Sequence, residues 1–282
     1  MNGLYIGIGI TLILALLAAL IGPFFVDWGT YRSVFEREAT KIVGYRVTVI
    51  GEVVARLLPS PRIRFGDVVI GPIDAPLMRV GRFELDVEAA PLLKGDVRVS
   101  EMRVERPTID LAIDHEARLV LPARAREARD PSAVAIDQIE IGGGRLTITD
   151  ARSGGRFEIG HIAAIGSAHS LAGPWRLDGG GNAEGRDLSF HLAGGRAADG
   201  GTAIKLQLSP GDDPAMLTAD LSLRDGPNGT AVAGRVVAER RGGEGASGLA
   251  AALATWRAEA TIAGDARALE ASGVPLALGP EG

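Results

Sequence analysis

The sequence predicts a mainly β protein in which a transmembrane helix and a short amphipathic helix precede an elongated antiparallel β-sheet. Glycine fills 39 of the 282 positions, about twice its usual share. That much glycine suits turns and bends better than helix interiors, where each one costs roughly 1 kcal/mol relative to alanine. After Gly44 the apolar residues alternate with polar ones at a period of two, which is typical of strands. The strand pattern also repeats along the chain, which indicates a sheet that grows by adding strand pairs.

The first segment, residues 4–26, carries no charged residue. Its 23 residues would span about 34 Å as a helix, enough for a hydrocarbon core of roughly 30 Å. A cleaved signal peptide is disfavoured, because no Lys or Arg precedes the run and the run is longer than a signal peptide needs. We therefore expect residues 1–29 to form an uncleaved membrane anchor. The basic residues after it are mixed with acidic ones, so charge alone leaves its orientation open.

A short amphipathic helix is expected directly after the anchor. Trp28 and Tyr31 lie where aromatic residues anchor a protein at the membrane interface. Between residues 30 and 43 apolar residues recur at helical spacing, and Gly44 supplies a stop. The apolar side of this helix could rest on the membrane surface or on the first strands, and packing on the strands is the simpler interpretation.

The region after the helix is predicted to be strands with one apolar and one solvated side. Alternation is clearest in four segments, 45–49, 62–65, 83–88 and 109–114. Two longer segments share one spacing, with apolar residues at relative positions 0, 3, 5, 10 and 12, and they start 37 residues apart, at Val99 and Ile136. This repeat favours a sheet built from similar units.

A polar, charged stretch over residues 122–134 has no strand pattern and is predicted to be a linker or loop. It separates an N-terminal helix-and-sheet region, 30–121, from a glycine-rich continuation of the sheet, 135–282.

Several kinds of chemistry are disfavoured by composition and motifs. The net charge is −5 with no large Lys/Arg cluster, so nucleic acid is an improbable partner. There is no cysteine, which excludes disulfides and thiolate zinc sites, and the four histidines lack metal-ligand spacing. The run Gly142–Arg145 lacks the ending of a phosphate-binding loop and reads as a hairpin turn. We therefore predict no enzyme activity, no catalytic or metal-binding residue and no cofactor.

The N-terminal part resembles the AsmA family of Gram-negative bacteria. The resemblance rests on Phe-Phe-Val-Asp-Trp at 24–28, Leu-Leu-Pro-Ser-Pro-Arg-Ile-Arg-Phe-Gly-Asp-Val at 57–68, Ala-Pro-Leu-Leu-Lys-Gly-Asp-Val at 90–97 and Arg-Pro-Thr-Ile-Asp-Leu at 106–111. The chain departs from the family at 114–120, where Asp-His-Glu-Ala-Arg-Leu-Val replaces the usual Asp-Gly-x-x-Asn-Trp stretch. The resemblance implies an inner-membrane anchor with the body in the periplasm. It also implies kinship with bridge-like lipid-transfer proteins, whose curved, open sheets form a gutter for acyl chains.

The leading hypothesis is a non-enzymatic, membrane-anchored periplasmic protein that binds or conducts phospholipids along an apolar β groove in outer-membrane biogenesis. The predicted groove residues are Ile63, Phe65, Phe83, Leu85, Val87, Ile109, Leu111, Ile113, Leu146 and Ile148. The same residues could instead form a closed core. In that case the protein would be a structural scaffold that assists outer-membrane protein assembly and carries no lipid.

Overall fold

The computed structural model describes residues 28–56, 60–88, 98–115, 119–120, 135–170, 173–197, 200–211, 213–226, 229–240, 255–265, 268–272 and 276–278. The predicted anchor at 4–26 and the predicted linker at 122–134 lie outside these ranges. Over the ranges given, no helix is both long and apolar enough to cross a membrane.

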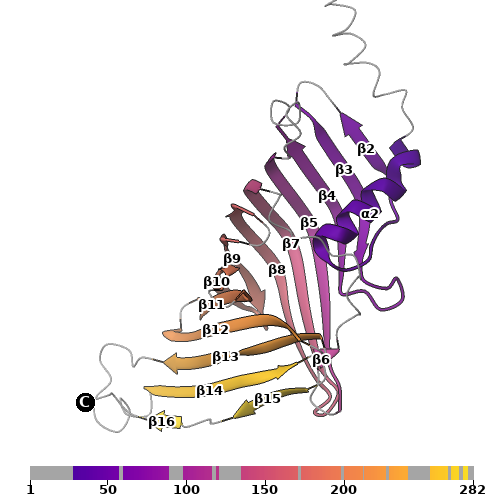
Figure 1. Ribbon diagram of the computed structural model, residues 1–282. Coiled ribbons are helices and arrows are strands. Elements are labelled where there is room, and N and C mark those ends of the chain that lie inside the picture. Colours follow the sequence, from indigo (N-terminus) through magenta and orange to yellow (C-terminus); the bar gives the residue numbers. More distant parts are fainter. Residues whose placement is uncertain are drawn as a thin grey trace, which may run out of the picture.

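One large β-sheet makes up nearly all of the described structure, with a single α-helix at its N-terminal end (Figure 1). In chain order the elements are η2 (Trp28–Tyr31), α2 (Arg32–Val43), β1 (Val47–Val49), β2 (Val53–Arg56), β3 (Arg62–Ile70), β4 (Met78–Val87), β5 (Arg98–Ile113), β6 (Leu119–Val120), β7 (Ala135–Asp150), β8 (Gly155–Ala168), β9 (Trp175–Ala183), β10 (Arg186–Arg196), β11 (Thr202–Pro210), β12 (Ala215–Gly226), β13 (Gly229–Arg240), β14 (Trp256–Asp265), β15 (Ala268–Ser272) and β16 (Leu276–Leu278).

The sheet is open and does not close into a barrel. Thirteen of its sixteen strands follow one path, from β1 through β3, β4, β5 and β7 and then in chain order from β8 to β15. The short strands β2 and β16 extend the two edges, on β3 and β14 respectively, and β6 pairs with β5. The prediction of a mainly β fold with an unclosed, mostly antiparallel sheet is confirmed. The sheet twists so strongly that β3–β8 run steeply and β12–β15 run across the view (Figure 1).

The repeat of 37 residues corresponds to two neighbouring strands, β5 and β7. Val99 pairs with Ile136 and Leu111 with Ile148, in one parallel register, so that the equivalent residues Arg103 and Glu140, separated by 37 positions, are hydrogen-bonded. The sequence analysis expected antiparallel pairing throughout, and this pair is the exception. Parallel neighbours need a connection of a dozen or more residues to bring the chain back to the same end of the sheet. Residues 114–134 supply that length, so the strands on either side of the predicted linker belong to one continuous sheet.

A row of residues with positive φ crosses the first part of the sheet. The backbone angle φ is positive at Asp67 in β3 (45°), Arg106 in β5 (50°), Gly143 in β7 (65°) and His161 in β8 (52°). Across each of them the apolar residues change from one parity of residue number to the other. The pairing keeps its offset on either side of Asp67 and Arg106, so neighbouring strands make this change together, and the register shifts at this row only where β8 pairs with β7 and β9. The break in the repeat between relative positions 5 and 10 lies at this row.

The expected amphipathic helix forms as α2 and packs on the strands. Phe35 and Ala39 contact a cluster of buried strand residues, and the ring of Phe35 meets that of Phe65 edge to face, with 5.4 Å between centroids. Trp28 and Tyr31 form the short η2 turn before it, and their assignment to the membrane interface stays a prediction.

The same helix also protects the β1 edge of the sheet. Glu36 Oε1 accepts a hydrogen bond from the Val49 N–H at 2.7 Å, and Thr40 Oγ1 accepts one from the Val47 N–H at 2.9 Å. Unpaired N–H groups of an edge strand otherwise invite pairing with other chains. The side chains of α2 therefore close this edge as well as covering one face beside it.

Two clusters of mutually packed buried residues lie in the described part of the sheet. The first lies beneath α2 and contains the buried residues Val47, Val49, Val53, Phe65, Val68 and Val80. The second contains Val99, Ile136 and Ala168, with Trp175 against it.

The packing beneath α2 predicts a difference between two phenylalanines. Phe65 is 7% exposed and Phe157, in β8, is 43% exposed. We expect Phe65→Ala to lower the free energy of unfolding by about 3–5 kcal/mol and Phe157→Ala to lower it by about 1 kcal/mol or less. Denaturant unfolding of the full chain in detergent measures both. Equal losses would contradict a closed core that is restricted to the α2 end.

Candidate functional site

Strand register places apolar residues opposite one another along the whole sheet. One row of paired positions crosses twelve strands from β2 to β14 with only apolar residues and glycine. Its members are Val53, Phe65, Phe83, Val104, Ile141, Ala164, Gly179, Phe190, Leu208, Leu217, Ala238 and Ala258. We call the side of the sheet that bears this row the apolar face and the opposite side the polar face. At about 4.8 Å between strands the row is roughly 53 Å long.

All ten predicted groove residues lie on the apolar face. Ile63 pairs with Leu85, Phe65 with Phe83, Ile109 with Leu146 and Leu111 with Ile148, while Val87 is opposite the buried Val99 and Ile113 is opposite Asp150. Their surroundings differ, however. Ile63, Phe65, Phe83 and Leu85 belong to the cluster beneath α2. The other six lie outside that cluster and are only partly buried.

Sequence reasoning missed the continuation of the apolar face beyond β8. Phe190 and Leu208 in β10 and β11, and Leu217 in β12, follow the same row. Alternation at 188–192, 204–208 and 217–223 was the signal that could have identified these residues. The many glycines of this half obscured it.

The apolar face is uncovered over β9–β14. Its large side chains there, including Leu192 and Leu206, are half-buried, and Ala219 is the one apolar residue that falls in the buried class in the described part of these strands. Residues of the same kind beneath α2 are buried. The difference arises because α2 covers only the first strands, where it contacts β1 (Figure 1).

Two glycines in this uncovered region make room for a large side chain on the neighbouring strand. A Cβ on Gly194 would meet the ring of Trp175 at 2.3 Å, and one on Gly179 would meet Phe190 Cζ at 2.8 Å. Each large residue is the direct cross-strand partner of the glycine. Each ring therefore lies over a glycine, close to the backbone of the sheet.

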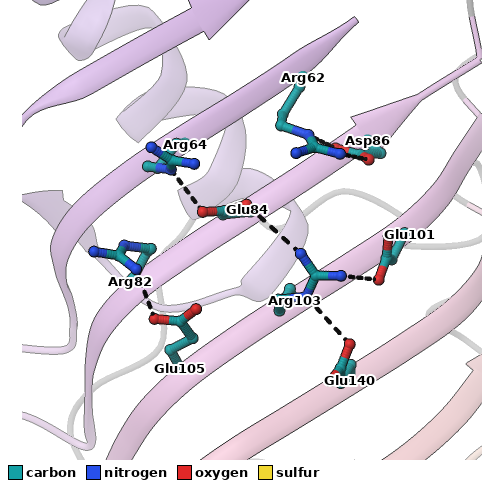
Figure 2. A network of polar contacts seen from close by, with 9 residues as sticks. All are labelled: Arg62, Arg64, Arg82, Glu84, Asp86, Glu101, Arg103, Glu105 and Glu140. Atoms are coloured by element: carbon teal, nitrogen blue, oxygen red, sulfur yellow. Dashed lines mark hydrogen bonds and ion pairs between the residues drawn. The ribbon is translucent and has the colours of Figure 1, made fainter. Parts of the chain in front are cut away.

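The polar face carries a network of ion pairs that crosses the strands (Figure 2). Arg64 donates to Glu84 at 2.6 Å, and Arg103 lies 3.9 Å from Glu84 and donates to Glu140 at 3.1 Å. Arg103 also contacts Glu101. Opposite charges directly across from each other stabilise a sheet, and this network links β3, β4, β5 and β7.

Hydrogen bonding also fixes the charge of two arginines in this network. The hydrogen bond to Asp86 raises the pKa of Arg62, and the hydrogen bond to Glu140 raises the pKa of Arg103. Both guanidinium groups carry a positive charge, as arginine does in proteins generally. The polar face is therefore charged and hydrated, in contrast to the apolar face.

The histidines and carboxylates of the described residues are not gathered into a reactive cluster. His191 Nδ1 lies 2.7 Å from Asp178 Oδ1, but both side chains are more than half exposed on the polar face. In the parts of the chain that the structure describes, no three His, Cys, Asp or Glu side chains are placed to hold a metal ion. The feature that distinguishes this molecule is an extended surface.

The contact between Trp175 and Gly194 predicts the effect of adding one methyl group. We expect Gly194→Ala to force the ring away from the sheet and to lower the free energy of unfolding by about 1–3 kcal/mol. Gly160→Ala is the matched control, because a Cβ there meets nothing within 4 Å, and its effect should be neutral or stabilising by about 0.4–1 kcal/mol. Denaturant midpoints measure the change, and a neutral result at both positions would show that the ring does not lie on Gly194.

Comparison with known proteins identifies the family of the chain. The model of the AsmA family matches residues 3–163, which is more than half of the chain. No curated protein and no solved structure gives a significant match. The matched region includes the helix α2, its buried cluster and the strands through most of β8. The chain belongs to the AsmA family.

Proposed function

We propose that this protein is a non-enzymatic component of the cell envelope whose apolar face binds or conducts the acyl chains of phospholipids. One observation carries the proposal. Apolar side chains continue in register for roughly 53 Å, and over β9–β14 they remain only partly buried. A sheet with one apolar face must cover it with protein or with a ligand.

The energetics suit movement of lipid better than tight binding. Taking an acyl chain out of water would contribute about 0.8 kcal/mol for each buried methylene group. A phospholipid that comes from a bilayer, however, leaves hydrocarbon that is as apolar as a leucine side chain. The net free-energy change of moving the acyl chain from the bilayer to the protein is then small. An acyl chain on an apolar surface also has few directional contacts to hold it in place.

The predicted anchor and the family membership suggest where in the cell lipid binding would take place. We propose that residues 1–29 cross the inner membrane, that Trp28 and Tyr31 lie at its interface, and that the sheet extends into the periplasm. The helix α2 would then lie next to the bilayer, and the uncovered strands β9–β14 would lie farther along the sheet. Acyl chains would pass across the strands, away from the inner membrane.

The alternative is a scaffold for outer-membrane protein assembly that carries no lipid. That function relied on a closed β core, whereas in the described strands β9–β14 one apolar residue, Ala219, is buried and the larger apolar side chains are only partly buried. Phospholipid content distinguishes the two. The full chain purified in detergent should retain phospholipid that mass spectrometry identifies, whereas a scaffold should retain none.

A charge on the apolar face tests the lipid path directly. We expect Leu111→Asp to reduce photocrosslinking to a phosphatidylcholine with a diazirine-bearing acyl chain by about a hundredfold, because a buried carboxylate costs several kcal/mol of binding free energy. Ala112→Asp is the matched control, since it adds the same charge to the exposed opposite side of β5. Full chains in vesicles of phosphatidylethanolamine and phosphatidylglycerol serve for both, with thermal unfolding to verify the fold.

Two results would contradict the proposal. Equal crosslinking of Leu111→Asp and Ala112→Asp would show that lipid does not use the apolar face. Absence of crosslinking to the unmodified protein would show that it does not bind acyl chains at all.

A further inference from the structure

A shallow hollow of about 520 Å³ is lined by residues of the strands β8, β9, β10 and β11. Its floor includes Ala193 and Ala203, whose small side chains leave the space above them empty. The volume lies within the range of sites for small ligands.

The charge of its lining sets this hollow apart from the rest of the polar face. Arg176, Arg196 and Lys205 line it, and no Asp or Glu does, although the chain as a whole carries a net charge of −5. Several basic residues elsewhere on the polar face have acidic partners across the strands, as with Arg64 and Glu84 or Arg235 and Glu259.

The pairing of opposite charges across the strands is interrupted at Arg176. Its direct partners are Ser167 on β8 and Ala193 on β10, both uncharged and small. Lys205 is the next residue in the same row, opposite Ala193, and its one cross-strand anion is Asp220 at 3.4 Å on the far side.

The spacing of the two cations fits a tetrahedral oxyanion. Arg176 and Lys205 are two strands apart, about 10 Å between backbones, and both project from the side of the sheet on which Ala193 leaves space. Long basic side chains can converge from this distance on one group above Ala193. Arginine binds phosphate with two parallel N–H donors, and lysine adds a point charge.

We propose that this hollow is a binding site for a phosphate group, either a phosphomonoester in solution or the phosphodiester of a lipid headgroup. The site is on the polar side of the sheet and does not depend on acyl chains binding to the apolar face.

Calorimetric titration of the full chain in a nonionic detergent tests the site. The ligands are inorganic phosphate, glycerol 3-phosphate and dihexanoyl phosphatidylglycerol. We expect saturable binding that weakens about tenfold or more in Arg176→Gln/Lys205→Gln, because two charge-assisted hydrogen bonds are lost. Arg235→Gln is the matched control, since it removes a basic residue from the same face at β13, where it pairs with Glu259. Lys205 and Arg176 are exposed, so these variants should keep the unfolding midpoint of the unmodified protein.

A lipid headgroup and a soluble phosphomonoester would give different results in this titration. A headgroup site predicts that dihexanoyl phosphatidylglycerol displaces inorganic phosphate and that the double variant loses this displacement. A site for soluble phosphomonoesters predicts that glycerol 3-phosphate displaces phosphate and the lipid does not. Absence of saturable binding for all three ligands would overturn the proposal, as would an equal loss in Arg235→Gln, which would show that only overall charge matters.

Discussion

The structure depends on strand register, which keeps one continuous row of apolar residues on the same side of a very wide sheet. A shift of one residue between any two strands would transfer the apolar side chains of one strand to the polar face. The pairs from β3 to β14 keep the row intact, even where the strands change from antiparallel to parallel at β5 and β7. The strands with positive φ at Asp67, Arg106 and Gly143 change parity together, so their apolar residues stay opposite one another.

The two faces then follow from this register. Along each strand segment, every second residue contributes to a continuous apolar surface. The residues between them point to the other face, where they form cross-strand ion pairs such as Arg103 with Glu140. The ion pairs are mostly exposed and individually contribute little to stability. Their effect is to favour one register over its neighbours, since a slip would place like charges or apolar groups opposite them.

Helix α2 determines where the apolar surface is closed and where it is open. It covers the first strands with Phe35 and Ala39 and satisfies edge N–H groups with Glu36 and Thr40. Twelve residues of helix cannot cover an apolar row that crosses twelve strands. The proposed path for acyl chains requires an amphipathic sheet of this kind, with cover at one end.

The amino-acid sequence by itself determined the class of fold, the helix at 32–43 and the apolar side of the first strands, because periods of 3.6 and 2 are local properties of the chain. It also contained the repeat between Val99 and Ile136, but not the fact that the two copies lie side by side in parallel. That arrangement depends on the path of the connection between them, which strand patterns do not encode. The run Gly142–Arg145 was assigned to a hairpin turn from sequence, but this assignment was wrong, since these residues lie inside β7. Gly179 and Gly194 likewise lie within strands, beneath Phe190 and Trp175. Only tertiary structure decides which residue sits across from a glycine, and only tertiary structure decides which part of an apolar face is covered, because both are contacts between segments distant along the chain.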